Sequence, residues 1–108
     1  MTFEDYQEVA RKTAVYPVIG HPIIYPALGL AGEVGELTEK IKKIFRDGDG
    51  DVQAHAPHLV KELGDILWYL STMCDVLGVS LSYVATVNNE KLMSRLERGM
   101  IKGSGDNR

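Results

Sequence analysis

Apolar residues recur every three or four positions along two long segments of the chain. In the first segment they are Leu30, Val34, Leu37, Ile41, Ile44 and Phe45. In the second they are Leu59, Leu63, Ile66, Leu70, Met73, Cys74 and Leu77. This recurrence matches the 3.6-residue turn of an α-helix with one buried face. The pattern therefore predicts two long amphipathic helices, over residues 27–46 and 56–77.

Capping residues predict a shorter helix on each side of this pair. Thr2 and Asp5 have the spacing of a capping box, which marks the start of a helix. A first helix is therefore expected from Thr2 to about Thr13. Ser80 is a favourable N-cap residue for a last helix that reaches about Arg98.

The remaining segments have the composition of loops. Residues 14–26 contain three of the prolines and are expected to form an irregular loop. Residues 103–108 are rich in glycine and small polar residues, which predicts a flexible tail. The chain is thus predicted to be all-α, with four helices in one domain over residues 1–102.

Each long helix carries two acidic residues three positions apart. These are Glu33 and Glu36 in the first helix, and Glu62 and Asp65 in the second. Residues three apart share a helix face, and both pairs lie at the same angle from the apolar stripe. Carboxylates at the edge of a buried face lose hydration and repel one another, which is unfavourable without a cation. Two helices packed through their stripes would therefore form a metal centre.

Ligand chemistry narrows the choice of metal. All four candidate ligands are oxygen donors, which suit Mg²⁺ or Mn²⁺. A di-iron bundle needs Glu-x-x-His motifs and zinc needs a Cys/His set, and the three histidines supply neither. A salt-bridge network with Lys40 and Lys61 is the alternative that needs no metal. Mg²⁺ held by carboxylates commonly acts on phosphates.

Polar residues of the last helix and one tyrosine are candidates for substrate contact. Asn88, Lys91 and Arg95 are three and four positions apart and share a face. Such a face suits a polyphosphate, although it also fits an ordinary polar surface. Tyr69 lies on the metal-facing edge of its helix. Trp68 points away from that edge, and we expect it to be buried against another subunit.

Gly35 and Gly64 occupy matching positions inside the long helices, each directly before the second acid of its pair. A glycine inside a helix costs about 0.5–1 kcal/mol relative to alanine, so its presence needs a reason. Close packing of the two helices is the first explanation. Clearance beside the metal is the second, and the two are compatible.

Composition excludes several classes of partner. The chain is 44% hydrophobic and 25% charged, with a net charge of −3, so it lacks the basic excess of a nucleic-acid-binding protein. No apolar run approaches the length that a membrane helix needs, and no signal peptide is expected at the N-terminus. Its one cysteine, Cys74, lies on an apolar stripe and is expected to be a buried thiol in a reducing cytoplasm.

These motifs resemble the MazG-like nucleoside triphosphate pyrophosphohydrolases, an all-α superfamily. Residues 28–37 and 62–70 look like the two acidic motifs of that family, Glu-x-x-Glu and Glu-x-x-Asp. The three polar residues of the last helix match a later pattern that is associated with phosphate binding. The resemblance covers about residues 3–98 of the chain.

The resemblance implies Mg²⁺-dependent hydrolysis between the α- and β-phosphates, which gives a nucleoside monophosphate and pyrophosphate. It implies that Glu33, Glu36, Glu62 and Asp65 bind the metal and that one of them orients the attacking water. Glu39 is a weaker candidate for that base. The cations of the last helix would balance charge on the leaving pyrophosphate. Sites of this family form between packed subunits, so a homodimer or a homotetramer is implied, and a short chain with long apolar stripes agrees with that.

Three other functions remain open from the sequence. Phosphoribosyl-ATP pyrophosphohydrolase and the dimeric dUTPase type are relatives with similar acidic pairs, although residues 29–36 look less like the first branch and the second is usually longer. A metal-free helical interaction module would use the acids only in salt bridges. Base preference would depend on the loop with Tyr16, His21 and Tyr25, unless that loop serves only in packing.

Overall fold

The protein consists of four α-helices and no β-strands, as the sequence predicts. The computed structural model describes residues 1–108. The helices are α1 (Phe3–Lys12), α2 (Ile24–Arg46), α3 (Ala56–Leu77) and α4 (Leu81–Glu97), with a single 3₁₀ turn, η1 (Gln53–His55), before α3. The all-α fold class is therefore confirmed.

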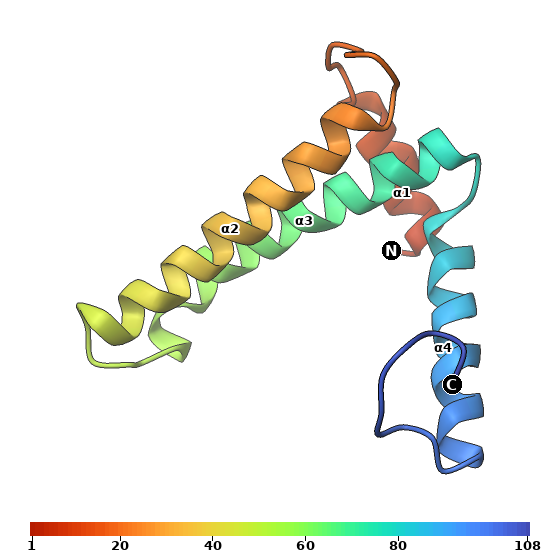
Figure 1. Cartoon of the computed structure of the whole chain (residues 1–108). Coiled ribbons are helices and arrows are strands. Elements are labelled where there is room, and N and C mark those ends of the chain that lie inside the picture. The colour runs from red at the N-terminus through yellow and green to blue at the C-terminus, as the bar shows by residue number, and fades with distance from the viewer.

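The two long helices form the axis of the molecule. α2 and α3 run antiparallel and lie side by side along most of their length (Figure 1). α1 packs beside the C-terminal half of α3, and α4 turns away from the long pair at the end of α3 (Figure 1). No single helix is long and apolar enough to cross a membrane; Gln53–Leu77 and Leu81–Glu97 meet that criterion only as a pair, by length and composition, across a bend of 99°.

The predicted helix ends agree with the structure except at the start of α2. The capping box between Thr2 and Asp5 is formed, and Ser80 caps α4 by accepting a hydrogen bond from a backbone N–H. Gly78 ends α3 with a φ of +71°, a conformation that favours glycine. α2 begins at Ile24 rather than at residue 27. Pro26 does not stop the helix because its missing N–H falls within the first turn, where no intrahelical partner exists.

Gln7 holds the corner where α3 meets α4. Its side-chain amide donates to Asp75 Oδ1 at 2.7 Å and to the Val79 carbonyl at 3.2 Å. Its carbonyl oxygen accepts a hydrogen bond from the backbone N–H of Leu81 at 2.8 Å. Gln7 is buried, so these bonds satisfy a polar group that would otherwise be costly to bury. α1 therefore fixes the direction in which α4 leaves the long pair.

The isolated chain has a thin core. Only 10 of 108 residues are buried, and the accessible surface is 7594 Å², against about 6,000 Å² expected for a compact monomer of this mass. The radius of gyration is 16.8 Å, against about 13 Å for a compact chain of this length. Apolar side chains therefore line surfaces that the chain itself does not cover.

The last ten residues fold back along α4 (Figure 1). The Arg98 guanidinium donates to the backbone oxygen of Arg108 at 2.8 Å, and the Arg108 guanidinium donates to the carbonyls of Gly105 and Ile101. The division into a domain over residues 1–102 and a flexible tail over residues 103–108 stays a prediction.

Candidate metal centre

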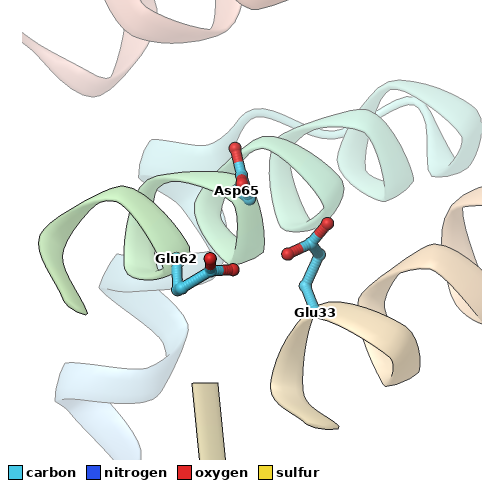
Figure 2. A group of neighbouring side chains, drawn as sticks. All are labelled: Glu33, Glu62 and Asp65. Carbon is cyan, nitrogen blue, oxygen red and sulfur yellow. The ribbon is translucent and has the colours of Figure 1, made fainter. Parts of the chain in front are cut away.

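Three carboxylates from the two long helices converge near the middle of the pair. Glu33 comes from α2, while Glu62 and Asp65 come from successive turns of α3. One carboxylate oxygen from each lies within 4.8 Å of the others. Figure 2 shows the Glu33 and Glu62 side chains extending toward one another from facing helices, with Asp65 beside them. The predicted convergence of the two acidic motifs is therefore present within one chain.

Glu36 lies at the edge of this group. Its side chain is exposed, and it is not among the three residues whose oxygens meet within 4.8 Å. Its charge still contributes to raising the pKa of Glu33. Glu36 is therefore a neighbour of the cluster, and its role as a ligand stays a prediction.

The cluster is electrostatically unfavourable without a cation. Burial, the closeness of Glu62 and the charges of Glu36 and Asp65 together raise the pKa of Glu33 to about 7. The Oε2 atoms of Glu33 and Glu62 are buried and have no hydrogen-bond partner. Unpartnered buried carboxylate oxygens are costly. A hard divalent cation would satisfy both oxygens and offset the repulsion, so the donor set fits such an ion.

Lys40 supplies part of the compensating charge. Its ammonium group pairs with Glu62 Oε1 across the two helices, and this contact lowers the pKa of Glu62. The salt-bridge alternative is thus present in part. It does not complete the site, because no lysine reaches Glu33 and the second oxygen of Glu62 has no partner. Lys61 forms no ion pair in the structure.

Tyrosines gather at the end of the cluster nearest the start of α2. The Tyr69 ring packs against Gly29, where an added β-carbon would lie 2.3 Å from the ring. Burial and then the charges of Tyr25 and Glu33 raise the pKa of Tyr69. Tyr25 in turn stacks on Tyr16 from the loop, with ring centroids 5.3 Å apart. Tyr69 therefore faces α2 from α3, and its contact with substrate stays a prediction.

Other predicted site residues lie away from the cluster. Glu39 pairs with Lys42 at 2.7 Å and with Lys43 at 3.7 Å along α2, and these contacts lower its pKa. Its carboxylate is therefore committed to lysines of its own helix, which makes it a poor candidate for a base.

The cations of α4 are paired with the C-terminal tail. Lys91 Nζ lies 3.0 Å from Asp106 Oδ1, and the buried Arg95 donates to the same oxygen at 3.4 Å and to the Gly105 carbonyl at 3.2 Å. Asn88 is exposed on the same helix. Because α4 projects away from the long pair (Figure 1), one chain does not bring these residues to the carboxylates. Their contact with substrate stays a prediction.

One packing explanation is wrong within the chain. A β-carbon added at Gly35 or Gly64 would meet nothing within 4 Å, so neither glycine permits close contact of α2 with α3. Gly29 does permit close contact of the two helices, because the bulky Tyr69 ring fills the space of its missing side chain. Trp68 is half-buried, and its indole N–H donates to Thr13 Oγ1 at 2.8 Å; its burial against another subunit stays a prediction. The α2 motif carries several glycines, and sequence alone did not indicate which one faces the aromatic ring.

Comparison with known proteins agrees with this arrangement. Residues 26–100 match the MazG nucleotide pyrophosphohydrolase domain, and the chain belongs to this family. It is 45% identical to the gene 37 protein of Mycobacterium phage L5 over 114 aligned positions, which cover 100% of both chains. It is also 31% identical to the uncharacterized protein YvdC of Bacillus subtilis, over 63% of this chain and 70% of that protein. No solved structure gives a significant match.

Proposed function

We propose that the protein hydrolyses nucleoside or deoxynucleoside triphosphates at the α–β phosphate bond. Water would attack the α-phosphorus, the bond from that phosphorus to the bridging oxygen would break, and the products would be a nucleoside monophosphate and pyrophosphate. This activity fits the clearance of unwanted nucleotides from the cellular pool. The observation that supports it most directly is the meeting of Glu33, Glu62 and Asp65 from the two family motifs.

Mg²⁺ is the proposed cofactor, with Mn²⁺ as a substitute of similar chemistry. Glu33, Glu62 and Asp65 would hold it, with Glu36 as an additional ligand at the edge. When bound, the cation would neutralise phosphate charge and stabilise the developing charge of the transition state. One carboxylate of the cluster would orient the attacking water and take its proton.

The nucleoside would lie on the tyrosine side of the carboxylates. Tyr69 borders the cluster, and Tyr16 and Tyr25 present a stacked pair at the same end of α2. Aromatic faces bind bases through stacking. This position leaves the opposite end of the cluster, toward Lys40, for the phosphates.

The chain would assemble into a homodimer or a homotetramer. The support for this assembly is the large uncovered surface of the chain together with an apolar groove along α4. Its lining includes Leu67, Leu70 and Val84, together with Asn88 and Lys91. A second copy seated there would come next to Lys91, so the cations of α4 could act on a nucleotide held by the other copy once Asp106 is displaced.

Hydrolysis in ¹⁸O-labelled water tests the proposed bond. A panel of ribo- and deoxynucleoside triphosphates with Mg²⁺ should yield monophosphate and pyrophosphate, with label in the monophosphate. Label only in pyrophosphate would mean attack at the β-phosphorus, and release of diphosphate and orthophosphate would mean attack at the γ-phosphorus. A phosphoribosyl-ATP or dUTP preference would appear as selectivity within an extended panel. A helical interaction module would turn over nothing and gain no thermal stability from Mg²⁺.

A further inference from the structure

A cavity of about 380 Å³ opens where the C-terminal end of α2 faces the N-terminal end of α3. Its polar lining includes Lys40 and Lys43 from α2, His55 from η1 and His58 from the first turn of α3. Its size lies within the range of about 300–1,000 Å³ that is typical of small-molecule sites. None of the acidic-motif residues lines it, so it is a separate feature of the same helix pair.

The lining carries two lysines, whose ammonium groups also pair with acids outside the cavity: Lys40 with Glu62, and Lys43 with Glu39 at 3.7 Å. The only acid in the lining, Asp47, is engaged on both carboxylate oxygens by the Arg46 guanidinium, at 2.8 and 2.7 Å. α3 begins here with no side-chain cap and no acidic residue in its first turn. The positive end of a 22-residue helix therefore faces the cavity without a compensating anion. Two lysines, two imidazoles and this helix end together favour an anion.

A metal ion does not fit the cavity. Glu33, Glu62 and Asp65 form the one group in the protein whose possible ligand atoms meet within 4.8 Å. His55, His58 and Asp47 therefore do not converge as a ligand set. What the cavity offers is ammonium and imidazole N–H groups, which donate hydrogen bonds to phosphate oxygens.

Lys40 connects the cavity to the carboxylates, because it lines the cavity and pairs with Glu62. Along α2 the order is tyrosines, carboxylates, then lysines: Tyr25, Glu33, Lys40 and Lys43. At 1.5 Å per residue, Lys40 lies about 10 Å and Lys43 about 15 Å beyond Glu33 along the helix axis, and the Lys40 ammonium reaches the carboxylates by pairing with Glu62. Base, α-phosphate and terminal phosphates follow one another in the same order in a nucleoside triphosphate.

We propose that this cavity is the subsite for the terminal phosphates of the nucleotide, and that it retains pyrophosphate after cleavage. The inference rests on the proposed function. It assigns Lys43, His55 and His58 as phosphate-binding residues that come from the same chain as the carboxylates. A triphosphate carries about four negative charges, so cations of α4 from a second copy can contact the same phosphates from the other side.

Binding of pyrophosphate without metal tests the subsite. Sodium pyrophosphate is titrated in EDTA into the full-length Glu33→Gln variant, whose weakened metal site prevents binding through a contaminating cation. Calorimetry should detect binding, and the imidazole NMR signals of His55 and His58 should shift while those of His21 do not. Lys43→Gln and His58→Asn should each weaken the affinity about tenfold, the loss expected for one hydrogen bond to a charged phosphate.

Lys42→Gln is the matched control. Lys42 precedes Lys43 on α2, does not line the cavity and shares the Glu39 carboxylate with Lys43, so its substitution removes the same charge while Lys43 stays in the subsite. An equal loss in Lys42→Gln would mean general electrostatic attraction and would overturn the proposal. So would undetectable binding, or a loss confined to Lys91→Gln, which would place the phosphates on α4.

The two proposals can fail separately. Release of pyrophosphate from triphosphates, with no pyrophosphate binding in the cavity, would refute the subsite and leave the activity standing. Pyrophosphate binding in the cavity without hydrolysis of any triphosphate would refute the activity, and with it the assignment of the cavity to a nucleotide. If the protein hydrolyses triphosphates and the cavity binds their terminal phosphates, Lys43→Gln should raise KM for the triphosphate more than it lowers kcat.

Discussion

The Tyr69 ring occupies the space that a side chain at Gly29 would fill, so an added β-carbon would lie 2.3 Å from the ring. This contact is the tightest approach of α2 to α3 at a glycine. It holds the tyrosine where burial and the charges of Tyr25 and Glu33 raise its pKa. Gly29 thus provides the space that holds Tyr69, a candidate for contact with substrate.

Gly29→Ala should therefore destabilise the fold and disturb the site. Displacing the Tyr69 ring is an overpacking defect, which typically costs about 1–3 kcal/mol. Gly32→Ala, one turn later in the same helix, has open space at its β-carbon and should stabilise the protein by about 0.5–1 kcal/mol through helix propensity. Chemical denaturation measures both changes. Destabilisation by Gly32→Ala would show instead that another copy packs closely over that face.

Substitutions in the cluster should abolish turnover and leave the helices intact. Glu33→Gln and Glu62→Gln keep the shape of each side chain but remove charge from the proposed metal site. Each is expected to lower kcat at least about a hundredfold, the loss typical of removing one electrostatic contributor to the transition state. Glu39→Gln is the control, because Glu39 is paired with Lys42 and should retain activity. More than a tenth of wild-type activity in both cluster variants would reject the assignment.

The pH dependence of stability follows from Glu33. Its folded-state pKa of about 7 lies above the ordinary value of 4.5, so the metal-free folded protein binds this proton more tightly than the unfolded chain. The stability that it contributes is complete below about pH 4.5 and is lost as the pH rises through about 7. In EDTA, Glu33→Gln should therefore have a higher Tm than the wild type at pH 8, with the difference shrinking toward pH 4.5.

Mg²⁺ should reverse the order of the two Tm values at pH 8, so that the wild type melts at a higher temperature than Glu33→Gln. A ligand that binds only the folded state raises Tm, and the wild type has the stronger site. Glu39→Gln again serves as the control: its pKa is lowered by Lys42, so its removal should not raise the Tm at pH 8. An unchanged difference between the wild type and Glu33→Gln across this pH range would show that the carboxylates do not repel one another as the geometry indicates.

The helices and the meeting of the acidic motifs could be predicted because both depend on local periodicity. A three-residue spacing fixes a face of one helix, and matching apolar stripes fix how two helices meet. The direction of α4 could not be predicted, because it depends on the hydrogen bonds of Gln7 at a corner far along the chain. The cavity with His55 and His58 was missed for a similar reason: the path of residues 47–55 determines which side chains it gathers.

Self-association should depend on the apolar groove along α4. Val84 is 45% exposed there, and Val84→Glu would place a charge where another copy is expected to bury apolar surface. Sedimentation should find an oligomer for the wild type and smaller species for this variant. Thr86→Glu adds the same charge on the same helix outside the groove and should leave the oligomer intact. A monomeric wild type would exclude the assembly proposed here.

Asp106 should compete with substrate for the cations of α4. Its carboxylate contacts both Lys91 and Arg95, yet its side chain is 82% exposed, so solvent screens these contacts and they are weak. Phosphate oxygens would need the same donors, because Lys91 and Arg95 can contact a triphosphate only when this carboxylate leaves. Asp106→Asn should therefore lower KM for the triphosphate modestly, by up to about fivefold, as expected for an exposed ion pair. Asp49→Asn makes the same change in charge at an aspartate that accepts only the backbone N–H of Asp51, and it should leave KM unaltered. Steady-state kinetics on both variants separates the effects, and an equal KM in Asp106→Asn and the wild type would show that Lys91 and Arg95 serve the tail rather than the nucleotide.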